Sequence, residues 1–248
     1  METRSEDETS IDFEELISKL VNSFLKDRKP SDRYTSFDYC YNYFRDFKNN
    51  NKISEIAVSG NLQISCLHVG FYLASWGMLR GSSYLLQKSI KYYESLIKEI
   101  LNFDRRIWSL DVDDYTKENM KLLLDCYEMI TNAFVPNGVK EETIVTKIML
   151  GVFGCVPAFD QNFCDAFREF FKGRCAFRRL NIDSLSYIKE FYKNNQNLID
   201  KWSNRIKTID LKTGNHTNLS YPKAKIIDMI GFTYGLVLKK LSEMKNQK

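Results

Sequence analysis

An aspartate and two lysines lie in the stretch from Val135 to Phe163, and these residue types support covalent and electrostatic catalysis. Asp160 is expected at the start of a helix, where the helix dipole favours an ionised carboxylate. A desolvated lysine has a lowered pKa and can attack a carbon centre as a Schiff-base former. Lys140 and Lys147 are seven residues apart, about two helical turns, so both can face one side. Either lysine can instead only hold a phosphate, and the sequence leaves that choice open.

Turn residues bracket the helix that must position these side chains. The tripeptide Pro-Asn-Gly at 136–138 favours a turn, because Pro fixes φ while Asn and Gly tolerate positive φ. A helix is expected from about 139 to 152, and Gly154 ends it. Pro157 then forces an extended step, so the next helix, about 159 to 171, begins near Asp160.

A second group of candidate residues lies upstream. The sequence predicts a long, nearly all-round apolar helix from about 61 to 88, in which four side chains recur every four residues and share a face: His68, Tyr72, Trp76 and Arg80. One interpretation is a buried core helix whose polar groups are satisfied. The other is a substrate-binding wall on which Tyr72 or Trp76 stacks and Arg80 contacts a phosphate or a base edge.

Basic residues are concentrated in the last third of the chain. The net charge is +4, but residues 172–248 carry 16 Lys and Arg against 6 Asp and Glu, a balance of +10, which leaves −6 upstream. A basic region joined to an acidic body suggests a face for a polyanion, although lysines on a solvated surface give the same imbalance. The candidates for contacts with a nucleic-acid backbone are Lys172, Arg174, Arg178 and Arg179.

Composition predicts an all-α globular fold. The 11 Gly and 4 Pro are too few for the turns of an all-β protein. No apolar run reaches the roughly 18 residues of a membrane span and the acidic start is not a signal peptide, so we expect a cytoplasmic protein without membrane contact. Six scattered cysteines and two histidines form no metal-ligand spacing, so we expect reduced thiols, no metal and no cofactor.

The rest of the chain is expected to form one helical domain. Residues 1–9 are interpreted as a disordered tail, and residues 10–248 as a compact multi-helix domain, either one body or two helical lobes with a cleft between them. The further predicted helices are 10–25, 36–47, 89–103, 116–133, 183–193, 196–207 and a last helix from Pro222, with a polar loop at 211–220. The acidic run 111–114 is expected to cap a helix, and Asp228, inside the last helix, to have an arginine or a helix terminus as its partner.

The stretch around Asp160 resembles the core of the helix-hairpin-helix DNA glycosylases, the superfamily of 8-oxoguanine glycosylases and endonuclease III. Val-Pro-Asn-Gly-Val-Lys at 135–140 is similar to the family's hairpin, and Pro-Ala-Phe-Asp at 157–160 to its aspartate motif. Thr-Lys-Ile-Met-Leu at 146–150 looks like the Thr-Lys-x-Leu pattern of divergent members. The hairpin lacks its second glycine, and the four-cysteine iron–sulfur motif is absent, so the resemblance is to a divergent member.

The resemblance implies an enzyme that cleaves the N-glycosidic bond of a modified base in double-stranded DNA, including foreign (for example phage) DNA. Asp160 would stabilise the oxocarbenium-like sugar and orient water, and Lys147 or Lys140 would act as nucleophile or phosphate contact. The base would flip into a pocket of Tyr72, Trp76, Arg80 and His68. We expect a monomer. The alternative is a non-catalytic helical module that binds nucleic acid or protein. A nuclease is less favoured, because no carboxylate cluster has metal-ligand spacing.

Overall fold

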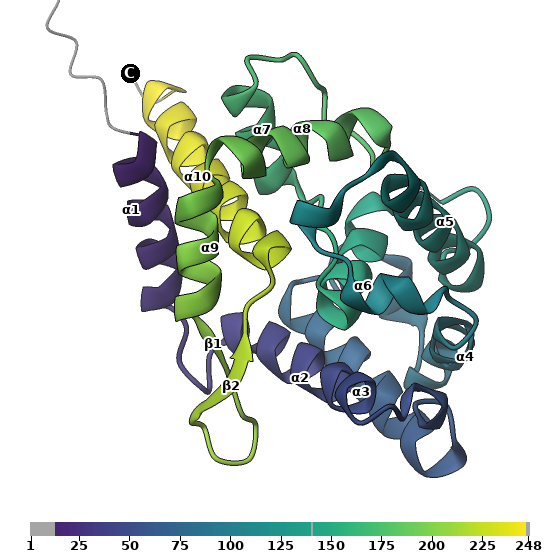
Figure 1. Cartoon of the computed structure of the whole chain (residues 1–248). Coiled ribbons are helices and arrows are strands. Elements are labelled where there is room, and N and C mark those ends of the chain that lie inside the picture. Colours follow the sequence, from purple (N-terminus) through teal and green to yellow (C-terminus); the bar gives the residue numbers. More distant parts are fainter. Residues whose placement is uncertain (1–12, 140, 247–248) are drawn as a thin grey trace, which may run out of the picture.

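A computed structural model of the chain describes residues 13–139 and 141–246, and helices dominate this part (Figure 1). Ten α-helices lie in it: α1 Phe13–Lys26, α2 Ser36–Asn49, α3 Ser59–Ser75, α4 Glu94–Ile100, α5 Lys117–Phe134, α6 Glu142–Phe153, α7 Gln161–Phe170, α8 Ile182–Asn194, α9 Gln196–Arg205 and α10 Lys223–Asn246. Two short strands, β1 Lys207–Ile209 and β2 His216–Ser220, pair antiparallel. The predicted all-α class is confirmed.

The last helix, α10, packs most extensively against α7 and also contacts α1 and α9. It lies beside α1 and α9 on one side of the molecule, whereas α4 and α5 lie on the opposite side (Figure 1). Its first half is buried almost all round, from Ala224 to Gly235. Buried apolar side chains from α1 to α10 form one hydrophobic cluster, which contains most of the aromatic residues. Burial of this apolar surface is the main driving force for folding.

The predicted helix from 61 to 88 ends early. The α3 helix stops at Ser75, and Gly77 follows with φ of +76°, in the left-handed region that only glycine adopts without strain. Two short 3-10 helices, η3 (Tyr84–Gln87) and η4 (Ile90–Tyr93), occupy much of the chain as far as α4. The helix expected at 89–103 is therefore shorter, and the loop expected at 211–220 contains β2 of a hairpin.

Two helices joined by a tight turn precede the candidate site, as predicted. The backbone N–H of Val139 donates to the carbonyl of Pro136 at 3.1 Å, and Gly138 has φ of +80°. This turn connects α5 to α6. Lys140, the tail at 1–9 and the start of the first predicted helix lie outside the described residues.

The structure also bears on several smaller predictions. The acidic run does cap a helix: the Asp111 carboxylate accepts hydrogen bonds from the backbone N–H groups of Lys223 and Ala224, in the first turn of α10. The six cysteines are free. In the described part of the chain, no helix combines the length and apolar character needed to cross a bilayer.

Candidate functional site

Asp160 occupies the N-cap position of α7. One carboxylate oxygen, Oδ1, accepts a hydrogen bond from the backbone N–H of Phe163 at 3.0 Å, and the backbone at Asp160 is extended. This is the capping geometry that aspartate favours, and it directs the carboxylate toward the positive end of the helix dipole. The sequence prediction that Asp160 begins a helix is confirmed.

Two threonines of α6 fix the segment that leads to Asp160. The Thr143 hydroxyl donates to the carbonyl of Phe159 at 2.9 Å, and the Phe159 N–H donates to the Thr146 hydroxyl at 2.9 Å. The chain can return along α6 because Gly154, with φ of +67°, ends that helix. The start of α7 is therefore held against the helix that carries Lys147.

Lys147 and Asp160 meet across the gap between α6 and α7. Lys147 Nζ lies 3.1 Å from Asp160 Oδ2, and the two side chains are only 4% and 16% exposed. Low exposure strengthens the attraction between the two charges. Two of the three residues predicted as catalytic are thus brought together, while Lys140 is outside the described residues.

Both side chains line a cavity of about 770 Å³, here called the Asp160 cavity. This volume lies within the range of small-molecule sites. Its walls come from η1 (Arg33–Thr35), the chain after α3, the facing sides of α6 and α7, and α10 from Phe232 onward. The lining residues are Arg33, Trp76, Met78, Arg80, Lys147, Asp160, Gln161, Asn162, Asp165, Phe232, Leu236, Leu238, Lys239 and Ser242.

Cations without an acidic partner surround the cavity. Its two carboxylates are already paired, Asp160 with Lys147 and Asp165 with Arg168. Arg33, Arg80 and Lys239 are exposed and have no ion-pair partner among the residues that the structure describes. Unpaired guanidinium and ammonium groups at a cavity mouth attract anions, and arginine binds phosphate and carboxylate groups in bidentate geometry.

Trp76 forms part of the cavity wall and contacts two lysines. Lys147 Nζ lies 4.7 Å from the centre of its rings and Lys225 Nζ lies 5.0 Å away. Tyr34 stacks on the indole at 5.4 Å. These distances fit cation–π contacts and aromatic stacking, which fix the indole. The indole N–H, however, has no hydrogen-bond partner within the described residues.

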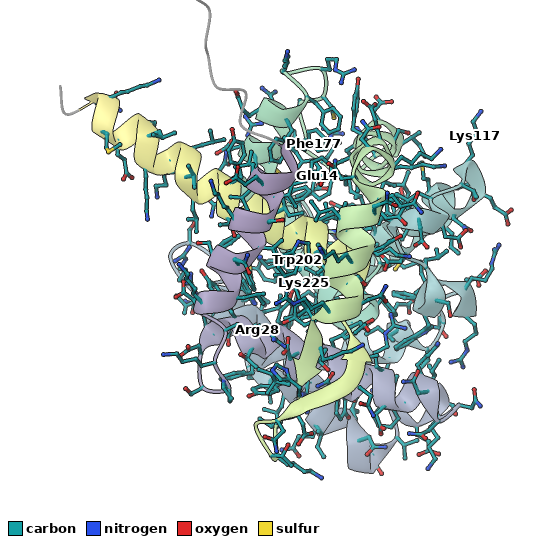
Figure 2. The ribbon with its side chains drawn as sticks, turned by 60° about the vertical axis from the view of Figure 1, so that its left-hand side comes forward. Glu14, Arg28, Lys117, Phe177, Trp202 and Lys225 are labelled. Atoms are coloured by element: carbon teal, nitrogen blue, oxygen red, sulfur yellow. The ribbon has the colours of Figure 1, made fainter. Side chains whose placement is uncertain are left out.

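Lys225 and Asp228 form a second buried pair behind this wall. Lys225 Nζ lies 2.6 Å from Asp228 Oδ2, and Figure 2 shows Lys225 in the middle of the molecule. Burial lowers the pKa of Lys225, and the nearby Asp228 carboxylate opposes that shift. The partner of Asp228 is therefore a lysine of its own helix, not the arginine or helix terminus expected from the sequence.

The predicted substrate-binding residues do not share one wall. Trp76 and Arg80 line the Asp160 cavity, but both follow the end of α3. Tyr72 is 2% exposed and packs in the core against Gly151, where an added Cβ would lie 2.5 Å from its ring. His68 lines a different cavity on the outer side of α3. The predicted shared face fails for two reasons: the helix ends before Trp76, and within α3 itself Tyr72 is buried in the core while His68 lines an outer cavity.

The predicted backbone-binding residues lie beyond the other end of α7. Lys172, Arg174, Arg178 and Arg179 belong to the loop between α7 and α8, here called the arginine loop (172–181). The ten residues of α7 separate it from Asp160 by about 15 Å along the helix axis. Arg174 is partly engaged by Glu190 at 3.4 Å, whereas Arg178 and Arg179 are exposed and without an ion-pair partner in the described part.

Sequence reasoning missed Arg33, Lys225 and Lys239. Arg33 lies in a short 3-10 helix that no hydrophobic periodicity marks, and its guanidinium lies 6.0 Å from the centre of the Trp76 rings. Lys225 had one local signal, since a lysine three residues before Asp228 in an apolar helix favours an ion pair.

No family model, curated protein or solved structure matches this chain. The likeness of the Asp160 stretch to the helix-hairpin-helix glycosylases therefore stays a hypothesis. Among residues 13–139 and 141–246, no three His, Cys, Asp or Glu side chains are grouped so as to hold a metal ion. What the site offers is a carboxylate, an amine, an aromatic wall and free cations around one cavity.

Proposed function

We propose that this protein is a DNA glycosylase-like enzyme that cleaves the N-glycosidic bond of a modified base in double-stranded DNA. The observation that carries the proposal is the convergence of Lys147 and Asp160, 3.1 Å apart, on the wall of the Asp160 cavity. The same two residues are nominated by the resemblance to the glycosylases. Modified bases of foreign DNA, such as phage DNA, are the substrates we favour.

The chemistry requires stabilisation of an electron-poor sugar. As the glycosidic C–N bond breaks, the base leaves with the bonding electron pair and takes up a proton, while positive charge develops on the sugar. Asp160 supplies a fixed negative charge in a partly buried site, where such a charge acts most strongly. Its cap bond to Phe163 holds one oxygen, so Oδ2 is the oxygen that faces Lys147 and the sugar.

Lys147 has two possible roles, which give different products. If its neutral amine attacks the anomeric carbon, it displaces the base, loses a proton, and the sugar ring opens at its C–O bond to give an imine, which borohydride reduces to a stable protein–DNA adduct. If it only pairs with Asp160 and contacts a phosphate, water attacks the sugar and leaves an intact abasic site. The pairing with Asp160 favours the second role, because the carboxylate already engages Lys147 Nζ.

The free cations around the cavity support a polyanionic substrate. Arg33, Arg80 and Lys239 are suited to the phosphates that flank a flipped nucleotide, and the cavity is large enough to admit one. The arginine loop, about 15 Å away along α7, would contact the backbone further along the duplex. We propose that the protein acts as a monomer.

A non-catalytic helical module that binds nucleic acid or protein is the second candidate. It is favoured by the two structural roles of Asp160, which caps α7 and pairs with Lys147. In this case the carboxylate stabilises the fold and the cavity binds a ligand without reacting. The two candidates differ in whether the wild-type protein releases a base.

The test is a screen of duplexes that each contain one modified base, scored for released base and for abasic sites. Wild type is compared with Lys147→Gln, with and without borohydride. We expect an abasic product from at least one duplex, and an adduct only if Lys147 is the nucleophile. Binding of DNA without release of any base would support the non-catalytic module.

A further inference from the structure

A second cavity opens on the outer side of α3. It has a volume of about 580 Å³ and lies between α3, α2 and the segment 30–33, with Leu211 of the β1–β2 loop at its edge. We call it the α3 cavity. Its floor reaches Cys40, which is 1% exposed, so it extends from the surface to the core. The catalytic proposal above makes no use of it.

The α3 side of the α3 cavity is apolar and unusually exposed, whereas the facing segment contributes the polar Ser31, Asp32 and Arg33. Phe71 is 68% exposed, Leu67 47% and Ile64 45%, although all three lie on one helix. A contiguous apolar patch of this kind on a folded protein marks a binding surface. An exposed phenylalanine is also the side chain on which nucleobases stack without regard to sequence.

One polar group in the α3 cavity matches the edge of a nucleobase. His68 stacks on Tyr43 with ring centres 4.1 Å apart, and its ring nitrogens have no hydrogen-bond partner in the described part of the chain. Burial lowers the pKa of His68 to about 4, so the imidazole is neutral at pH 7. A neutral imidazole offers one donor and one acceptor, as a base edge does.

Arg33 connects the two cavities. It lines both the α3 cavity and the Asp160 cavity, and it has no acidic partner among residues 13–139 and 141–246. Its guanidinium is held 5.1 Å from the centre of the Tyr34 ring. A cation fixed between two cavities is placed to bind the phosphate that joins two nucleotides.

We propose that the α3 cavity binds a second nucleobase of the DNA whose target nucleotide occupies the Asp160 cavity, with the intervening phosphate on Arg33. The base stacks on Phe71 and hydrogen-bonds to His68. This inference rests on the proposed function of the Asp160 cavity, to which it adds a binding site for a second base. The substrate would be a duplex distorted at two adjacent positions.

The test uses duplexes with 2-aminopurine next to the modified base and the Asp160→Asn protein, which should bind without cleaving. We compare this protein with double variants that add Phe71→Ser or His68→Phe, the second of which keeps the ring stacked on Tyr43. Leu86→Ser is the matched control, because Leu86 is 52% exposed and lines neither cavity. Melting temperatures confirm that each variant folds.

We expect the neighbouring 2-aminopurine to change its fluorescence on binding, and we expect Phe71→Ser to weaken binding about 10-fold. His68→Phe should reduce the fluorescence change, and Leu86→Ser should alter neither.

If wild type releases the base but both variants match the control, the α3 cavity inference is wrong and the glycosylase proposal stands. If wild type neither binds nor cleaves DNA, both fail. If Phe71→Ser instead abolishes self-association in sedimentation, a second copy of the chain occupies this face.

Discussion

The Asp228 carboxylate accepts a hydrogen bond from the backbone N–H of Ala158 at 3.1 Å. This bond ties α10 to the segment two residues before Asp160. The other carboxylate oxygen is paired with Lys225 at 2.6 Å. The position of Asp160 is therefore determined partly by a helix that begins more than 60 residues later in the chain.

Removing the negative charge of Asp228 should destabilise the protein. Asp228→Asn leaves the Lys225 ammonium group buried without a counter-charge, and breaking a buried pair in this way costs about 3 kcal/mol. Urea unfolding measures the change in the free energy of unfolding. The exposed Asp125→Asn is the control and should change this free energy by less than about 0.5 kcal/mol. Equal free energies of unfolding for the two variants would show that the Lys225–Asp228 pair does not stabilise the fold.

Stability should depend on pH through His68. The unfolded chain protonates this histidine below pH 6.5, but the folded chain only below about pH 4, because burial lowers its pKa. The unfolded state thus binds more protons between these values, and stability is lost as the pH falls through that window. His68→Phe should remove about 2 kcal/mol of the loss between pH 7 and pH 4.5. Parallel curves for wild type and variant would contradict this assignment.

The arginine loop should contribute to DNA affinity through counterion release. Neutralising both exposed arginines in Arg178→Gln/Arg179→Gln should lower the slope of log affinity against log salt by up to about 2, since each phosphate contact contributes about 0.9. The control removes two exposed charges from α5, in Lys117→Gln/Lys121→Gln, and Figure 2 shows Lys117 at the periphery. An equal slope change in both variants would indicate a diffuse electrostatic effect.

Residues that end or interrupt helices made much of the candidate site predictable from the sequence. Gly154 and Pro157 mark the end of one helix and the extended step before the next, so Asp160 was placed at a helix start from sequence alone. Lys147 lies in the preceding helix, which the sequence predicts from about 139 to 152. These inferences succeeded because each depends on residues within about one helix of one another.

Contacts between distant segments were not predictable in the same way. Arg33, Trp76 and Lys239 meet at one cavity through tertiary packing, which no local pattern encodes. The predicted helix from 61 to 88 would place Gly77 in a helix interior, but its positive φ shows that it follows the end of α3. Glycine fits both interpretations, and an apolar sequence on either side conceals the break.

The central claim is that the Asp160 carboxylate stabilises the sugar during base release. Asp160→Asn tests it directly, because asparagine also caps a helix N-terminus and changes the charge with little change in shape. The measurement is the single-turnover rate of base release, with the melting temperature and DNA affinity measured in parallel. We expect the rate to fall by at least about 100-fold in a variant that still folds and binds DNA, with a lower melting temperature because the buried Lys147 loses its partner. Base release at the wild-type rate by the folded variant would contradict the claim.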